Sequence, residues 1–155
     1  MTTIVVDREM GYMAADRMAS SNDCEVAIEC PKIKRLELSD GVHLMASSGH
    51  EASATIFEEW YESEDEDLLD PLEDMEDVDK FTTVVLTPDF EIYLADHFYR
   101  LYQVHPRWYA TGTGGPFAWA VLMAGCGIDK AMTTAIKMDP SSGFGYDIEY
   151  INEDR

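Results

Sequence analysis

The chain has 155 residues, a length typical of one domain and sufficient for a hydrophobic core. Its 31 Asp and Glu residues against 11 Lys and Arg residues give a formal net charge of −20 at pH 7. Because Lys and Arg supply the affinity for phosphate backbones, this charge argues against a protein that coats DNA or RNA. It argues equally against docking on anionic membranes, and no apolar stretch approaches the roughly 18 residues of a membrane span. No nucleic acid and no membrane are therefore expected as partners, and the first residues do not resemble a signal peptide.

The cysteines and histidines form no metal-binding or disulfide pattern. Cys24, Cys30 and Cys126 contain no CxxC pair, and the four histidines show neither HxH nor HExxH spacing. An odd number of unpaired cysteines is typical of a reducing compartment. The sequence therefore predicts a cytoplasmic protein without a metal or other cofactor.

The first third of the chain predicts antiparallel strands followed by a helix. Thr3–Asp7 and Tyr12–Ala15 are short apolar runs on either side of Gly11, which predicts a hairpin. Further strands are expected over Glu25–Ile28, Lys32–Leu38 and Val42–Ala46. Over residues 49–61 the apolar positions recur every fourth residue, which predicts an amphipathic helix.

An acidic run interrupts this pattern. The 22 residues from Glu58 to Asp79 carry 13 acids and no base. Such a block repels itself, so a surface loop or a frayed helix is the simple interpretation. The functional alternatives are a docking site for a basic partner and a DNA-mimicking patch. We expect a single domain over residues 1–155 with an acidic variable insertion at about 62–79.

The second half of the chain predicts more strands and two helices. Strands are expected over Phe81–Thr87, Phe90–Ala95, His97–Val104, Trp108–Gly112 and Phe144–Ile151. Pro116–Ala124 is apolar almost all round, which predicts a helix buried between layers. A stripe with a period of 3.6 residues from Ile128 to Ile136 predicts a second helix, ended by Asp139-Pro140. The order of elements is typical of the α+β class, with two antiparallel sheets and helices outside.

The start of the chain offers a nucleophile. Thr2 has a small side chain, so removal of Met1 by an aminopeptidase would give Thr2 a free α-amine beside its hydroxyl. An α-amine has a pKa of about 7.7–8.0, so a useful fraction is neutral at pH 7 and can accept the hydroxyl proton. Many proteins begin with Met-Thr, so this signal alone is weak.

Five segments together resemble the proteasome β subunits and HslV, which are threonine peptidases of the N-terminal-nucleophile (Ntn) hydrolase superfamily. The opening TTIVVD…GYMAADRMAS is similar to the family's N-terminus. The other four follow in the family's order: CPKIKRLEL, MASSGHEASATIFEEW, TGTGGPFAWAVLMAG and MDPSSGFGYDIEYI. The resemblance covers most of the chain apart from the acidic run, and GTGGPFA is its most specific part. It implies the Ntn-hydrolase fold, a four-layer αββα sandwich of two antiparallel sheets between helix layers.

The resemblance implies a catalytic role for three residues. Thr2 matches the nucleophile, Lys32 matches the lysine that tunes it, and Asp16 matches the aspartate that holds this lysine. The glycines of TGTGG would pack beside the nucleophile. The simple alternatives are a surface charge for Lys32 and a turn cap for Asp16.

Five further residues have matching positions. Asp139 and Ser142 match the accessory residues that form hydrogen bonds around the terminal amine, and Thr113 occupies the usual serine position. Asp139 could equally be only a helix terminator. The oxyanion-hole glycine falls near Ser48, with Gly49 next, and a backbone N–H can serve with any residue except proline.

The function implied by the resemblance is a threonine endopeptidase that hydrolyses unfolded polypeptides inside a self-compartmentalised ring. The implied partners are further copies of the chain, which form the homo-oligomer, and an AAA+ unfoldase is a candidate. Two alternatives remain open. One is a catalytically inactive scaffold or assembly subunit with the same fold, and the other is an acidic docking or DNA-mimic protein.

Overall fold

The computed structural model describes residues 2–21, 24–63 and 80–152, so residues 64–79 of the expected acidic insertion lie outside the described part of the chain. The strands before the first helix are β1 (Thr3–Asp7), β2 (Tyr12–Asp16), β3 (Met18–Ser21), β4 (Cys24–Glu29), β5 (Ile33–Leu38) and β6 (Gly41–Gly49). They are followed by α1 (Glu51–Ser63), β7 (Phe81–Leu86), β8 (Ile92–Ala95), β9 (Leu101–Val104) and β10 (Trp108–Gly112). The last elements are α3 (Gly115–Met123), α4 (Ile128–Met138) and β11 (Tyr146–Tyr150).

The strands form two large antiparallel sheets and one small one. The four-stranded sheet has the order β10-β1-β2-β11, and the five-stranded sheet has the order β5-β6-β7-β8-β9. β3 and β4 pair only with each other among the described strands. In the four-stranded sheet β1 lies between β10 and β2, with Thr3 opposite Gly112 and Ile4 opposite Ala15.

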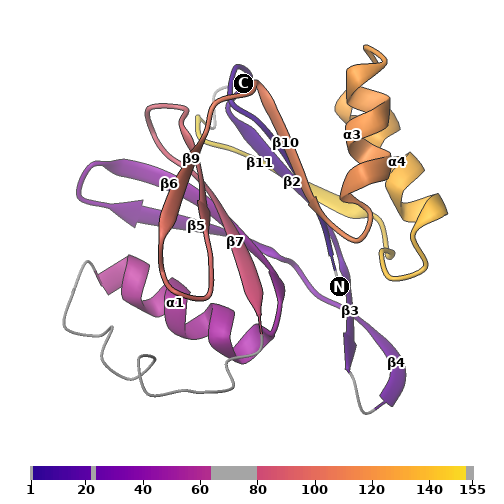
Figure 1. The fold of residues 1–155 in the computed structure, drawn as a ribbon, viewed down its shortest axis with the longest axis horizontal. Coiled ribbons are helices and arrows are strands. Elements are labelled where there is room, and N and C mark those ends of the chain that lie inside the picture. The colour runs from indigo at the N-terminus through magenta and orange to yellow at the C-terminus, as the bar shows by residue number, and fades with distance from the viewer. Residues whose placement is uncertain (1, 22–23, 64–79, 153–155) are drawn as a thin grey trace.

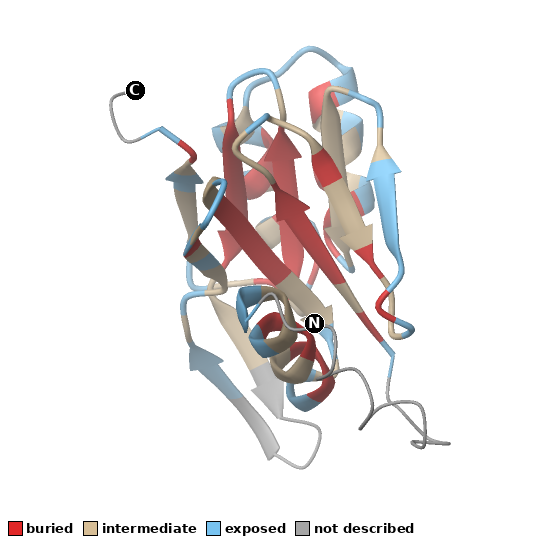
Figure 2. Cartoon of the chain, turned by 90° about the vertical axis from the view of Figure 1, so that its left-hand side faces the viewer, coloured by how far each residue is buried: buried red, intermediate tan, exposed pale blue. Residues whose placement is uncertain are grey.

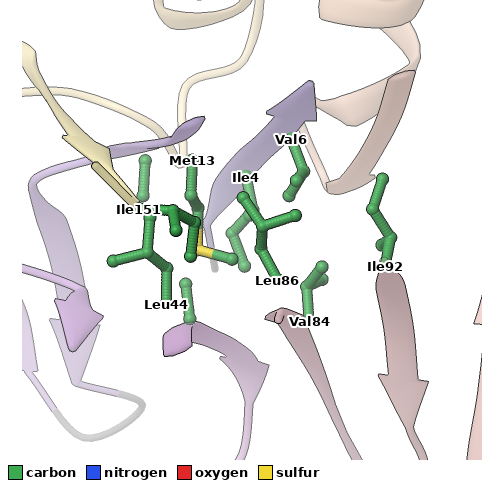
Figure 3. Packing of buried hydrophobic residues seen from close by; sticks show 10 residues of the cluster. Ile4, Val6, Met13, Leu44, Val84, Leu86, Ile92 and Ile151 are labelled. Carbon is green, nitrogen blue, oxygen red and sulfur yellow. The ribbon is translucent and has the colours of Figure 1, made fainter. Parts of the chain in front are cut away.

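The two large sheets pack face to face, with α1 on the outer face of the five-stranded sheet and α3 and α4 on that of the four-stranded sheet (Figure 1). Ile4 and Val6 of β1 lie in the core between the sheets, together with Leu44 and Leu86 (Figure 3). Val5 points the other way and packs against α3 and α4. On the far side, α1 packs on the five-stranded sheet through Phe57 and neighbouring side chains. The result is the predicted four-layer αββα sandwich.

Burial on both faces explains the sequence of the central strands. All five residues of β1 and all five of β2 are buried, so neither strand alternates apolar with polar residues (Figure 2). The hairpin predicted at Gly11 is present, with Gly11 at φ 67°. The helix predicted over residues 49–61 is α1, which begins two residues later and ends at Ser63.

The predicted position of one helix was wrong. The apolar helix expected between layers is α3, which lies in the outer layer with Met123 65% exposed. Of the residues in α3, only Gly115, Ala118 and Leu122 are buried. The residues after Asp16, for which no strand was predicted, form β3, which pairs with β4. No helix among the described residues is long and apolar enough to cross a membrane.

Positive φ at three non-glycine residues leads to a prediction about stability. Phe90, Tyr99 and Phe144 have φ of 61°, 59° and 57°. Phe90 packs on the inter-sheet core and Tyr99 belongs to the core under α1, whereas Phe144 is 48% exposed. A left-handed conformation costs an L-residue about 1–2 kcal/mol, and the extra chain entropy of glycine costs about 0.5–1 kcal/mol.

We therefore expect Phe144→Gly to leave the free energy of unfolding unchanged or to raise it by up to about 1 kcal/mol. Phe90→Gly relieves the same strain but removes a packed ring, so it should lose about 3 kcal/mol. Urea unfolding of both variants and the wild type measures the contrast. A loss at Phe144 as large as that at Phe90 would contradict the expectation.

Candidate active site

Thr2, Asp16 and Lys32 meet at the start of β1. The Lys32 Nζ donates hydrogen bonds to Thr2 Oγ1 over 2.8 Å and to Asp16 Oδ1 over 2.9 Å. Thr2 and Asp16 are buried, and the Lys32 side chain is only 9% exposed. The largely buried ammonium therefore touches both the hydroxyl oxygen and the carboxylate.

The Asp16 carboxylate is held by backbone donors as well as by the lysine. Its Oδ1 accepts from the Thr3 N–H over 2.8 Å. Its Oδ2 accepts from the N–H of Met18 and of Gly143, over 3.0 and 3.1 Å. With both oxygens engaged, this carboxylate has a fixed orientation toward Lys32.

The strand order explains how distant residues reach one place. β1 and β2 are hairpin partners, so the first residues of β1 lie beside Asp16 at the end of β2. Lys32 precedes β5 of the opposite sheet and reaches across from there. A Cβ atom on Gly112 would lie 1.6 Å from the Thr2 carbonyl oxygen, so only glycine fits beside the start of β1. The glycine turn thus packs against Thr2, as the resemblance implied.

A second polar cluster lies around Asp139, just after α4. Its Oδ2 accepts from Thr113 Oγ1 over 2.6 Å and from Ser142 Oγ over 2.7 Å, and its Oδ1 accepts from the Ser141 N–H. Ser142 Oγ also lies 2.7 Å from Thr3 Oγ1. Burial by itself would raise the pKa of Asp139, but these hydrogen bonds outweigh it and hold the pKa below its ordinary value.

This lowered pKa predicts how stability depends on pH. Because the carboxylate is favoured in the folded state, ionised Asp139 stabilises the fold above about pH 4, and this contribution is lost as pH falls through the folded-state pKa. We expect Asp139→Asn to cost most stability near neutral pH and progressively less below about pH 4. Urea unfolding over a pH series measures this difference, with the exposed Asp89→Asn as a control. A cost for Asp139→Asn that stays constant into strong acid would contradict the expectation.

The structure brings together six of the eight residues that the sequence singled out. Thr2, Asp16 and Lys32 form one cluster, and Thr113, Asp139 and Ser142 form the other. The remaining two, Ser48 and Gly49, lie at the end of β6 opposite Thr82 and Phe81 of β7. They are outside both hydrogen-bonded clusters, and their oxyanion role stays a prediction.

Thr3 joins the two clusters, and sequence reasoning gave it no role. Its N–H donates to Asp16 and its hydroxyl contacts Ser142. The signal that could have pointed to it is the Thr-Thr pair at the start of a strand, because consecutive strand residues face opposite sides.

As for metals, His, Cys, Asp and Glu residues in the described ranges form no group of three or more that could hold an ion.

Comparisons with known proteins agree with this architecture at the level of the fold. No family model and no curated protein matches the sequence. Among solved structures, HslV from Trypanosoma brucei is similar with a TM-score of 0.69 and 20% identity, covering 96% of this chain and 98% of that one. BPH from Thiobacillus denitrificans has a TM-score of 0.66 and 16% identity, covering 99% of each chain. The same BPH in complex with epoxomicin has a TM-score of 0.65 and 16% identity, covering 97% of this chain and all of that one. The resemblance seen in the sequence is thus confirmed for the fold: the chain has the αββα architecture of HslV and BPH.

Proposed function

We propose that this chain is a threonine endopeptidase that hydrolyses unfolded polypeptides with Thr2 as an N-terminal nucleophile. One observation carries the proposal: the largely buried Lys32 ammonium contacts both Thr2 Oγ1 and Asp16 Oδ1. An ammonium beside a hydroxyl stabilises negative charge on its oxygen and disfavours a proton on a nearby amine. Both effects activate a threonine that has a free amine. The fold shared with BPH, which was solved with epoxomicin bound, supports the same class of chemistry.

The reaction uses groups of this chain alone. Thr2 Oγ attacks the peptide carbonyl carbon while the α-amine of Thr2 takes the hydroxyl proton, giving a tetrahedral oxyanion. Backbone N–H groups near Ser48 and Gly49 would stabilise that oxyanion. The C–N bond then breaks as the amine returns its proton to the leaving nitrogen. Water, deprotonated by the same amine, hydrolyses the ester and regenerates Thr2.

The proposal requires Thr2 to be the terminal residue. While Met1 is attached, the nitrogen of Thr2 belongs to an amide and cannot act as a base. Intact mass of the purified protein and cleavage of unfolded casein test this requirement together. We expect a species without Met1 that cleaves casein in the cytoplasmic pH range. A protein shown to lack Met1, in its native assembly, that does not cleave casein would overturn the proposal and favour the scaffold alternative.

Confinement in a self-associated ring is part of the proposal, because a protease acting on unfolded chains must not reach the rest of the cell. The apolar outer surface of α3, with Met123 exposed, supports association. Residues 112–138 contain one Asp and two Lys, in contrast with the net charge of −20 for the whole chain. Two copies can therefore approach through this surface with little repulsion. An AAA+ unfoldase remains a candidate for the delivery of substrate.

We expect a homo-oligomer larger than a dimer, whose assembly strengthens with salt because salt screens the acidic charge. Met123→Glu should shift it to smaller species, while Met10→Glu, an exposed methionine in the β1–β2 turn, should not. Multi-angle light scattering at low and high salt measures both. A monomeric wild type at tens of micromolar under both conditions would contradict the expectation.

A further inference from the structure

Thr3 is the one residue, among those whose hydrogen bonds are described above, that contacts both polar clusters of the site. It is fully buried, at 0% exposure. Its backbone N–H donates to Asp16 Oδ1 over 2.8 Å, and its Oγ1 lies 2.7 Å from Ser142 Oγ. Its backbone N–H and its hydroxyl are therefore each engaged, one in each cluster.

The pleat of β1 places the two threonines on opposite faces of the four-stranded sheet. Thr2 contacts Lys32, which comes from the opposite sheet. Thr3 points to the helix side, where a Cβ on Gly114 would lie 1.9 Å from Thr3 Oγ1 and 3.3 Å from the Ala135 Cβ. The Asp139 cluster is thus hydrogen-bonded to the residue after the nucleophile.

The direction of each hydrogen bond follows from the number of protons. Ionised Asp139 can only accept, so Thr113 and Ser142 both donate to its Oδ2. Ser142 has a single hydroxyl proton, which this bond uses. In the contact between Thr3 and Ser142, Thr3 must therefore be the donor. The chain of donors runs from Thr3 to Ser142 and ends on the carboxylate.

We propose that Thr3 is a positioning residue that fixes the first residues of β1 against the Asp139 cluster and so sets the place of the Thr2 hydroxyl. This inference rests on the proposed peptidase function. Asp16 holds the Thr3 N–H, which belongs to the peptide bond with Thr2, and the Ser142 hydroxyl holds the Thr3 side chain. Loss of the Thr3 hydroxyl removes the second restraint and leaves the buried Ser142 oxygen without that donor.

Three variants separate the hydroxyl from packing. Thr3→Val keeps the shape but has no hydroxyl, and Thr3→Ser keeps the hydroxyl but lacks the methyl group. Thr83→Val is the matched control, because Thr83 is also a fully buried threonine with its Oγ1 2.7 Å from a serine Oγ, that of Ser47. Its contact lies under α1 and not at the start of β1.

The probe is a peptide epoxyketone such as epoxomicin, whose labelling of the N-terminal fragment is followed by mass. We expect Thr3→Val to slow the maximal labelling rate by about tenfold to a hundredfold, because misplacement of a reacting group by about 1 Å costs up to about 10²-fold in rate. The epoxyketone concentration that gives half of the maximal rate should change little. Thr3→Ser and Thr83→Val should stay within about threefold of the wild type. All variants are compared at a temperature where unfolding curves show them folded, with Met1 removal confirmed.

Equal maximal rates for Thr3→Val and the wild type would overturn the inference, as would an equal loss in Thr83→Val. If Thr3→Val does not fold, Ser142→Ala is used instead, because it removes the acceptor of the same hydrogen bond. This variant must slow labelling to a similar extent. Failure of both variants to fold would make the pair a stability element and overturn the positioning role. A wild type without Met1 that takes no label indicates instead that the proposed function has failed.

Discussion

Lys32→Ala should lower the peptidase kcat/KM by on the order of 10²-fold or more while the protein remains folded. The variant removes the ammonium that contacts Thr2 Oγ1, so the hydroxyl and the terminal amine both lose their electrostatic activation. The buried Asp16 loses one charged partner but keeps the N–H donors of Thr3, Met18 and Gly143. We therefore expect destabilisation below the roughly 3–5 kcal/mol typical of a broken buried ion pair.

Lys34→Ala is the control for this prediction. Lys34 lies two residues further along the chain, is 52% exposed, and pairs with Glu58 of α1. Glu58 is buried but also accepts a hydrogen bond from Ser47 Oγ, and the Lys34 end of the pair is exposed. The variant should therefore cost less than the roughly 3–5 kcal/mol of a broken buried pair, and activity should change by no more than a few-fold. Initial rates on a peptide substrate, together with thermal unfolding, measure both variants. Lys32→Ala with activity close to that of Lys34→Ala would remove Lys32 from the mechanism.

The local parts of the fold could be predicted because local patterns determine them. Gly11 between two apolar runs predicts the β1–β2 hairpin, and the spacing of apolar residues predicts α1 and α4. The clusters of the site are of a different kind, because their members are separated by up to 139 positions along the chain. Ordered motifs shared with a known family brought Thr2, Asp16 and Lys32 forward. The link between Thr3 and Ser142 depends on which way each side chain faces, which sequence spacing does not determine.

The wrong placement of α3 has a physical reason. A helix that is apolar all round is usually covered on every side, so the sequence pattern favours a position between layers. In the structure one side of α3 packs on β1 and α4, while Met123 on another side remains exposed. The composition of α3 is thus consistent with a surface that a second copy covers in the proposed assembly.

Thr2 is the residue whose substitution should have the largest effect, and two changes should abolish activity for different reasons. Thr2→Ala removes the hydroxyl and leaves the terminal amine. Retention of Met1, enforced by inhibiting the aminopeptidase during expression, keeps the hydroxyl and leaves the nitrogen of Thr2 in an amide. Each should reduce casein cleavage to background, because the mechanism requires both groups on one residue.

Thr2→Ser tests the same mechanism from the opposite direction. The serine keeps the hydroxyl and the amine and loses only the methyl group that restrains the side-chain rotamer, so partial activity should remain. A peptide epoxyketone should add its mass to the N-terminal fragment of the wild type and of Thr2→Ser, but not to that of Thr2→Ala. Activity in Thr2→Ala at the wild-type level would exclude Thr2 as the nucleophile. Label found on Thr3 would keep the class of mechanism and move the nucleophile by one residue, to a hydroxyl that in this structure is hydrogen-bonded to Ser142 and not to Lys32.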